Sequence, residues 1–192
     1  MSAWRSFRGT RKLKRADLEH ILRASRQITG EDEFILLGSQ SILGKWPDAP
    51  RALRVSMELD IYPRYRPELA DLIEGSLGQL SQFDATFGYH ADGVGPETAV
   101  LPPDWESRLI PVRTEQTGGA TEWCLDPYDL AFAKLAAGRS KDLEIVASLL
   151  IHHLITPKRL ERHLNLAETP ELKERLLDQY TICQRRRKAL EP

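Results

Sequence analysis

The feature that most restricts how this chain can fold is a short apolar run that stops at Gly-Ser, in the stretch EFILLGSQSILG from Glu33 to Gly44. Its four consecutive apolar residues, 34–37, are typical of a strand that is buried on both faces. The residues from Ser39 to Leu43 then favour a short helix. The stretch therefore predicts a buried strand that turns sharply into a helix, which places a β-sheet in the N-terminal part of the chain.

Further helices and strands are expected on both sides of this unit. Apolar spacing predicts an amphipathic helix over residues 16–28 and another over 68–80, with a second strand from Val55 to Tyr62 between them. From Phe83 to Cys124 glycine and proline are dense, so a meander of short strands is expected there, with a turn at residues 91–96. This order of elements predicts an α+β fold with an α/β-like mixed sheet.

Four helices are expected after residue 125. Asp126 is followed by proline, which is typical of a helix start, and Gly138 is a suitable stop. Ser140 can cap the next helix. Thr156 and Thr169 each precede a proline, so the same start signal occurs twice more. The chain is therefore expected to end in a group of C-terminal helices.

The length of 192 residues fits one domain with a small appendage. We expect a basic arm over residues 1–15, which hold six Lys or Arg and no acid, then a main domain over 16–150 and a helical segment over 151–192. The arm either neutralises RNA phosphates or is simply solvated. The formal net charge of −1 gives no overall field that would favour nucleic acid or membrane.

Nothing in the sequence predicts export or a membrane anchor. No apolar run reaches the roughly 18 residues that a transmembrane helix needs, and the N-terminus lacks the apolar stretch of a signal peptide. Cys124 and Cys183 have no partners at metal-binding spacing, which indicates thiols in a reducing compartment. A cytoplasmic location is therefore expected.

Two carboxylates stand one residue apart in the second expected strand, within SMELDIYP. Side chains two apart share a face of a strand, so Glu58 and Asp60 point one way while Leu59 and Ile61 point into the core. At about 6 to 7 Å the two charges repel, and a divalent cation between them reverses that interaction. Mg²⁺ prefers carboxylate oxygens together with substrate phosphates. The pair is a candidate metal site, although a strand with one solvated face has the same pattern.

The Gly-Ser turn is a candidate phosphate site. Gly38 has no Cβ, so the backbone there can approach a phosphate closely. The helix that follows offers free N–H groups, and Ser39 adds a hydroxyl donor. The alternative is structural, with Gly38 as a tight turn and Ser39 as a helix N-cap.

Together, LLGSQSILG and SMELDIYP resemble the signature of the nucleotidyltransferase superfamily, which has the DNA polymerase beta-like fold. In that superfamily the Gly-Ser turn holds the triphosphate and the strand acids hold Mg²⁺. The resemblance therefore implies that Gly38 and Ser39 bind nucleotide and that Glu58 and Asp60 bind Mg²⁺. This chain departs from the usual, shorter spacing, because 18 residues separate Ser39 from Glu58 and the loop GKWPDAPRA must be inserted.

The segment from Leu125 to Leu150 narrows the resemblance. It is similar to the helical motif of uncharacterised nucleotidyltransferases related to the AbiEii-type toxins of bacterial toxin–antitoxin and abortive-infection systems. In those proteins a helix lysine and a later acid complete the site, and the matching residues here are Lys134 and Asp142. Arg139 and Lys141 lie nearby. From the residues alone, Lys134 is equally a solvated lysine, and Asp142 is equally a stabilising acid in the first turn of a helix.

The residue type at position 58 departs from the superfamily pattern, and the identity of a third strand acid is not decided by the sequence. Glu58 stands where many members have aspartate, and the superfamily tolerates either residue. Some relatives also use a third strand acid. Glu122 is the candidate for it here, although strand geometry equally allows Glu122 to face solvent.

The leading hypothesis is an enzyme that transfers a nucleotide from an NTP to an acceptor with Mg²⁺. Its expected catalytic residues are Glu58, Asp60, Lys134 and Asp142. The resemblance implies that the acceptor is RNA such as a tRNA 3′ end, and that the protein acts as a toxin with a cognate antitoxin protein. The alternative hypothesis is a catalytically inactive nucleotide- or RNA-binding module of a toxin–antitoxin pair.

Overall fold

The computed structural model describes residues 12–190, so residues 1–11 of the expected basic arm lie outside the described part. Short 3-10 helices occupy several of the connections between the main elements. The α-helices and strands are, in chain order, α1 (Arg15–Thr29), β1 (Glu33–Leu36), α2 (Ile42–Lys45), β2 (Glu58–Pro63), α3 (Ala70–Leu77), α4 (Gln82–Phe87), β3 (His90–Gly93), β4 (Ile110–Val112), β5 (Thr121–Cys124), α5 (Pro127–Ala137), α6 (Ser140–Ile151), α7 (Pro157–Leu164) and α8 (Pro170–Leu190).

The five strands of this region form one mixed sheet in the order β3-β2-β1-β5-β4. β1 pairs antiparallel with β2 and parallel with β5, β2 pairs parallel with β3, and β4 pairs antiparallel with β5. The predicted α+β class is therefore confirmed, including the mixed sheet and the C-terminal helices.

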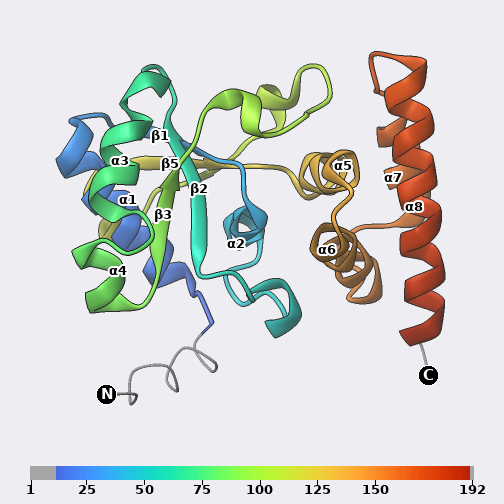
Figure 1. Ribbon diagram of the computed structural model, residues 1–192, viewed down its shortest axis with the longest axis horizontal. Coiled ribbons are helices and arrows are strands. Elements are labelled where there is room, and N and C mark those ends of the chain that lie inside the picture. Colours follow the sequence, from blue (N-terminus) through green and yellow to red (C-terminus); the bar gives the residue numbers. More distant parts are fainter. Residues whose placement is uncertain (1–11, 191–192) are drawn as a thin grey trace.

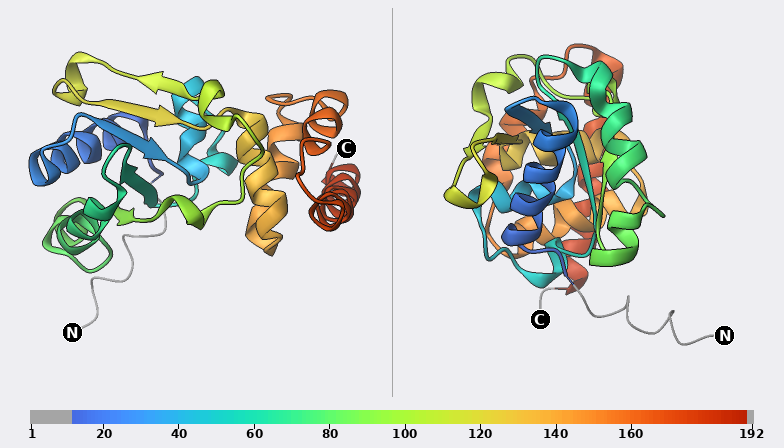
Figure 2. Two further views of the ribbon diagram at one scale, coloured as in Figure 1. Left: turned by 90° about the horizontal axis from the view of Figure 1, so that it is seen from above. Right: turned by 90° about the vertical axis from the view of Figure 1, so that its left-hand side faces the viewer.

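The helices form two groups. α1, α3 and α4 lie together on one side of the sheet, and α5 to α8 gather on the other side of the molecule (Figure 1). In the view from above, the sheet occupies one part of the molecule and the C-terminal helices the other (Figure 2). α8 packs against α5 and α6. The division of the chain at residue 150 stays a prediction.

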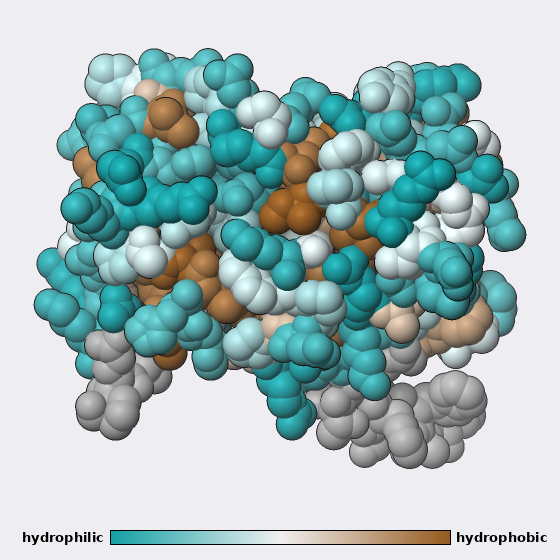
Figure 3. Space-filling view, turned by 180° about the vertical axis from the view of Figure 1, so that it is seen from behind, coloured by the Kyte–Doolittle hydropathy of each residue, from teal (hydrophilic) through white to brown (hydrophobic). Residues whose placement is uncertain are grey.

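The core covers both faces of the central strand β1. Residues 34–36 of β1 are all buried, as their continuous apolar run predicts. Leu59 and Ile61 of β2 are completely buried, as the alternation in that strand predicts. Cys124 and Cys183 are also buried free thiols. On the side of the molecule that faces away in Figure 1, apolar residues form separate patches within a mainly hydrophilic surface (Figure 3).

Two elements differ from the prediction for the middle of the chain. The expected turn at 91–96 begins with strand β3, and helix α4 comes directly before this strand. α4 is short but capped, because the Ser81 hydroxyl accepts from the Asp84 N–H at 3.1 Å and Gly88 ends it at φ 73. Glycine fits in β3 because a Cβ at Gly93 would collide with the Ala70 backbone of α3. Turn-like residues therefore form a strand here because a helix packs tightly against it.

None of the helices within residues 12–190 combines the length and the apolar character that crossing a membrane requires.

Candidate active site

Three acids and a histidine meet on one face of the sheet edge. The register of β2 and β3 sets Glu58 opposite His90 and Asp60 opposite Asp92, and residues directly opposite each other share a face. One potential ligand atom from each of Glu58, His90 and Asp92 lies within 4.8 Å of the others. Two adjacent strands therefore supply a cluster of oxygen and nitrogen donors.

Asp92 was missed because its segment was interpreted as a turn. The signal in the sequence was the alternation in YHADG, where the buried residues Tyr89 and Ala91 flank His90 and precede Asp92. Period-two alternation over so few residues is weak beside several glycines and a proline. Only the pairing with β2 shows that Asp92 shares a face with Asp60.

Burial and mutual repulsion disfavour the charged forms of these acids. Burial raises the pKa of Asp60 above its ordinary value, the Glu58 charge raises it further, and Lys134 acts in the opposite direction. Burial is also the main reason that the pKa of Asp92 rises to about 6; His90 acts in the opposite direction, and Glu58 and other acids raise this pKa further. Carboxylates held together in this way are stabilised by a nearby positive charge.

The Gly-Ser turn is in direct contact with this cluster. The Leu37 N–H donates to the Asp60 carbonyl at 2.9 Å, which extends the pairing of β1 with β2 as far as the turn. A Cβ at Gly38 would overlap the Asp60 carboxylate and stand 3.1 Å from its Cγ. The φ of Gly38 is −76°, so glycine is needed here for this close approach rather than for a left-handed backbone.

The helix after the turn is shorter than a phosphate-binding helix. Ser39 begins a three-residue 3-10 helix, and α2 adds only four residues. So short an element has little dipole, so the anion-binding capacity of the turn rests on single N–H groups and on the Ser39 hydroxyl.

The predicted lysine and acid of the C-terminal helices form an ion-pair cluster. Lys134 Nζ of α5 is 3.4 Å from Asp142 Oδ1 of α6. Arg139, in the connection between these helices, donates to both carboxylate oxygens of Asp142 at 2.6 and 3.2 Å. Burial opposes ionisation of Asp142, but the hydrogen bond from Arg139 and the Lys134 charge outweigh it and lower its pKa. Asp142 is completely buried, and its carboxylate holds the Lys134 and Arg139 side chains in place.

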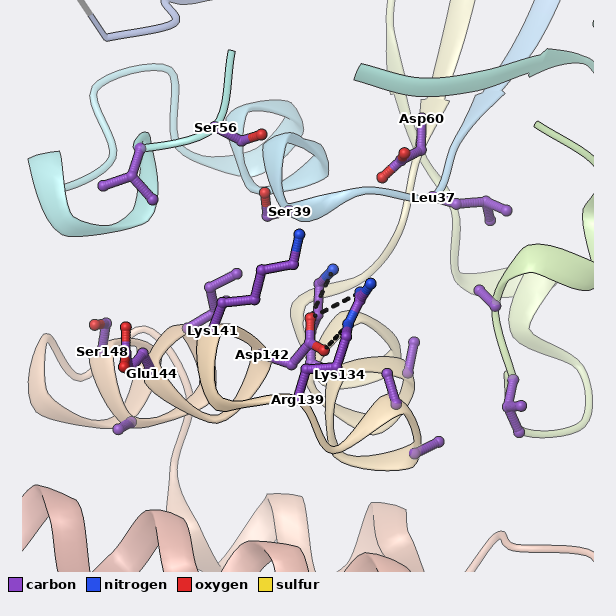
Figure 4. A pocket seen from close by; sticks show the side chains of 18 of the residues that line it. Leu37, Ser39, Ser56, Asp60, Lys134, Arg139, Lys141, Asp142, Glu144 and Ser148 are labelled. Atoms are coloured by element: carbon purple, nitrogen blue, oxygen red, sulfur yellow. Dashed lines mark hydrogen bonds and ion pairs between the residues drawn. The ribbon is translucent and has the colours of Figure 1, made fainter. Parts of the chain in front are cut away.

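Two of these acids, Glu58 and Asp60, line one cavity of about 880 Å³ together with the cations. Asp60 points from β2 into the same space that Lys134, Arg139 and Lys141 enter from the helices, and Ser39 lies between the two sides (Figure 4). The loop inserted before β2 contributes Ala52 to the wall. Residues that were 70 or more positions apart in the sequence therefore face one another across a single cleft.

A model of the protein family described as "nucleotidyltransferase of unknown function (DUF6036)" matches residues 15–182. The chain belongs to this family. The match includes the Gly-Ser turn, both acidic strands and the helices with Lys134 and Asp142. No curated protein and no solved structure gave a match.

In this nucleotidyltransferase Glu122 is not part of the acidic cluster. β5 pairs with β1 so that Glu122 stands opposite Phe34, on the face that carries Ile61 and not Asp60. The third acid of the cluster is therefore Asp92, and Glu122, the candidate from the sequence, neither joins the cluster nor faces solvent. The physical reason is that strand alternation fixes the face of a residue only after the register is known.

Glu122 is instead a buried carboxyl group beneath α1. Its side chain is completely buried, and neither carboxylate oxygen has a hydrogen-bond partner among residues 12–190. Burial raises its pKa to about 8; the Arg15 charge lowers it and the Glu19 charge raises it further. The group is therefore held mainly in its neutral form near pH 7.

We expect Glu122→Gln to stabilise this nucleotidyltransferase increasingly as the pH rises. Between the ordinary carboxyl pKa and the raised one, the folded wild type binds more protons than the unfolded chain, so its stability falls with rising pH. Glutamine does not titrate, so its advantage over the wild type should grow by on the order of 3 kcal/mol between about pH 5 and pH 8. Urea unfolding at both pH values measures this difference.

Glu171→Gln, at an exposed position of α8, is the matched control and should show no such trend. If the stability difference between Glu122→Gln and wild type is the same at both pH values, Glu122 does not titrate as described.

Proposed function

We propose that this protein transfers a nucleotide from an NTP to an acceptor, with a divalent cation such as Mg²⁺ held by Glu58, Asp60 and Asp92. The observation that carries the proposal is the cavity whose opposite walls bear carboxylates and cations. A metal-bound triphosphate has the complementary arrangement, with a positive centre on one side and phosphate oxygens on the other.

The residues present fit a divalent cation. Carboxylate oxygens are hard ligands of the kind that Mg²⁺ prefers, and the charged forms of Asp60 and Asp92 are disfavoured without a positive partner. When bound, the ion would supply a bridge between phosphate oxygens and neutralise charge that develops during transfer.

The other side of the cavity would hold the phosphates. Gly38 lets the turn approach the Asp60 carboxylate closely, and Ser39 offers a hydroxyl donor to a phosphate oxygen. Lys134, with Arg139 and Lys141, would place positive charge along the triphosphate. Asp142 would act as a positioning residue, because its carboxylate holds Lys134 and Arg139 in place.

The acceptor that we propose is RNA, with a tRNA 3′ end as the first candidate, and the biological role is that of a cytoplasmic toxin with a protein antitoxin. Support for a polyanionic acceptor comes from α8, where Arg175 and Arg186 line the cavity and Arg187 and Lys188 continue the basic run. The relation to AbiEii-type toxins is part of this proposal.

Incubation of the protein with each NTP, Mg²⁺ and total tRNA tests the proposal. Label from an α-³²P NTP should enter the RNA, whereas label from the γ-phosphate should not, because nucleotidyl transfer releases pyrophosphate. Binding of NTP without incorporation would support the inactive module instead. Transfer of γ-label would indicate phosphoryl transfer and contradict the proposed reaction.

A further inference from the structure

His90 occupies an unusual position in the acidic cluster. It is the residue of β3 directly opposite Glu58, and only 8% of it is exposed. Its Nε2 lies 3.4 Å from Asp92 Oδ1, and its Nδ1 lies 3.5 Å from Asp84 Oδ1. Nδ1 is buried without a hydrogen-bond partner in the described part of the chain. The imidazole is therefore placed between two carboxylates.

Asp84 is held firmly on the far side of the ring. Its Oδ2 accepts from the Leu80 N–H at 3.1 Å, and its own N–H donates to the Ser81 hydroxyl at the start of α4. Asp84 is also almost completely buried. A carboxylate fixed in this way is suited to accept a hydrogen bond from the Nδ1–H group and to set the orientation of the ring.

In this orientation the other ring nitrogen, Nε2, faces the carboxylate of Asp92. With the proton on Nδ1, Nε2 carries a lone pair and points toward the carboxylate of Asp92. Two lone-pair groups facing each other in a buried site repel, and a metal ion between them removes the repulsion. A carboxylate that orients a histidine whose other nitrogen binds a metal is a common arrangement in metal sites.

We propose that His90 is a nitrogen ligand of the metal centre, oriented by Asp84, and that the centre consequently selects Mn²⁺ over Mg²⁺. The inference rests on the metal centre of the proposed function. Imidazole is a better ligand for first-row transition ions than for Mg²⁺, while carboxylates bind Mg²⁺ and Mn²⁺ alike. A donor set of carboxylates and one imidazole therefore fits Mn²⁺ and makes Mg²⁺ the more weakly bound ion.

Electron spin echo measurements on the protein loaded with Mn²⁺ alone test the nitrogen ligand directly. The wild type should show ¹⁴N modulation from a bound imidazole, and His90→Gln should lose it. His152→Gln removes an exposed histidine at the end of α6 and should retain the modulation. Bound Mn²⁺ without ¹⁴N modulation in the wild type would overturn the proposal, whether or not the variants fold.

Titration of the protein with Mn²⁺, followed by the electron paramagnetic resonance signal of the free ion, tests the selectivity for Mn²⁺ over Mg²⁺ when it is done with and without competing Mg²⁺. The ratio of the Mg²⁺ to the Mn²⁺ dissociation constant should fall at least about tenfold in His90→Gln, because only the nitrogen distinguishes the two ions. Asp84→Asn should weaken Mn²⁺ binding by about 10- to 100-fold while the ¹⁴N modulation remains. An unchanged ratio in a folded His90→Gln protein would contradict the selectivity.

These measurements contain no nucleotide, so they separate the two proposals. Mn²⁺ binding through His90 with no nucleotide transfer would overturn the proposed reaction alone. Nucleotide transfer with a metal centre that lacks nitrogen would overturn this inference alone. Failure to bind Mn²⁺ at all would contradict both.

Discussion

Asp60→Asn is expected to reduce nucleotide transfer at least about a thousandfold, which corresponds to about 4 kcal/mol of activation free energy. Asp60 is the acid that lies against the Gly-Ser turn and faces the cation-lined side across the cavity. Asparagine keeps its shape but loses the anionic oxygen that would hold the metal. Single-turnover rates with labelled NTP measure the effect.

The same variant should keep or slightly exceed the wild-type stability. The raised pKa of Asp60 means that its charged form is disfavoured in the folded protein, so stability falls as the pH rises through the range between its ordinary and its raised pKa. Asparagine removes that penalty. Asp178→Asn, at an exposed site on α8, is the control and should leave both rate and melting temperature unchanged. Full activity in folded Asp60→Asn protein would remove Asp60 from the metal centre.

Asp142→Asn is expected to destabilise the protein by about 2 to 3 kcal/mol and to raise the KM for NTP. Removing one partner of a buried ion pair leaves the other charge uncompensated, which costs about 3 to 5 kcal/mol in a fully buried pair. Here the Lys134 side chain is 13% exposed but that of Arg139 is 60% exposed, so Arg139 can turn to solvent and the expected cost is smaller. Urea unfolding and steady-state kinetics measure the two effects.

The double variant Lys134→Met with Asp142→Asn separates structure from function. Methionine fills the volume of the lysine stem without a charge, so most of the lost stability should return, because a buried ion pair can be replaced by apolar packing at little cost. Activity should not return, because the cation that faces the phosphates is absent. Recovery of activity together with stability would show that Lys134 and Asp142 have only a structural role.

Capping residues and apolar alternation in the sequence were sufficient to predict most helices and strands of the fold. The caps at Asp126 and Gly138 define α5, since the Asp126 side chain accepts from the Tyr128 N–H at 2.9 Å and Gly138 adopts φ 68. The alternation in β2 likewise placed Leu59 and Ile61 in the core. Such signals act within a few residues, so no tertiary contact is needed to read them.

The strands in the middle of the chain could not be predicted from such local signals. β3 contains turn-forming residues and is a strand because β2 pairs with it and α3 packs on it. The same register decides that Asp92 joins Asp60 and that Glu122 lies on the opposite face. A shift of one residue in pairing exchanges the two faces of a strand, and the sequence of one strand does not state its partner.

Signals between neighbouring residues are enough to predict the sharp turn at Gly38, the acids on one face of β2, and the helices with Lys134 and Asp142. The packing of the folded chain was needed to show that these groups share one cavity and that Asp92, His90 and Asp84 lie beside them. Backbone propensity and side-chain alternation depend on neighbours along the chain, whereas a site assembled from two strands and two helices depends on how distant segments pack.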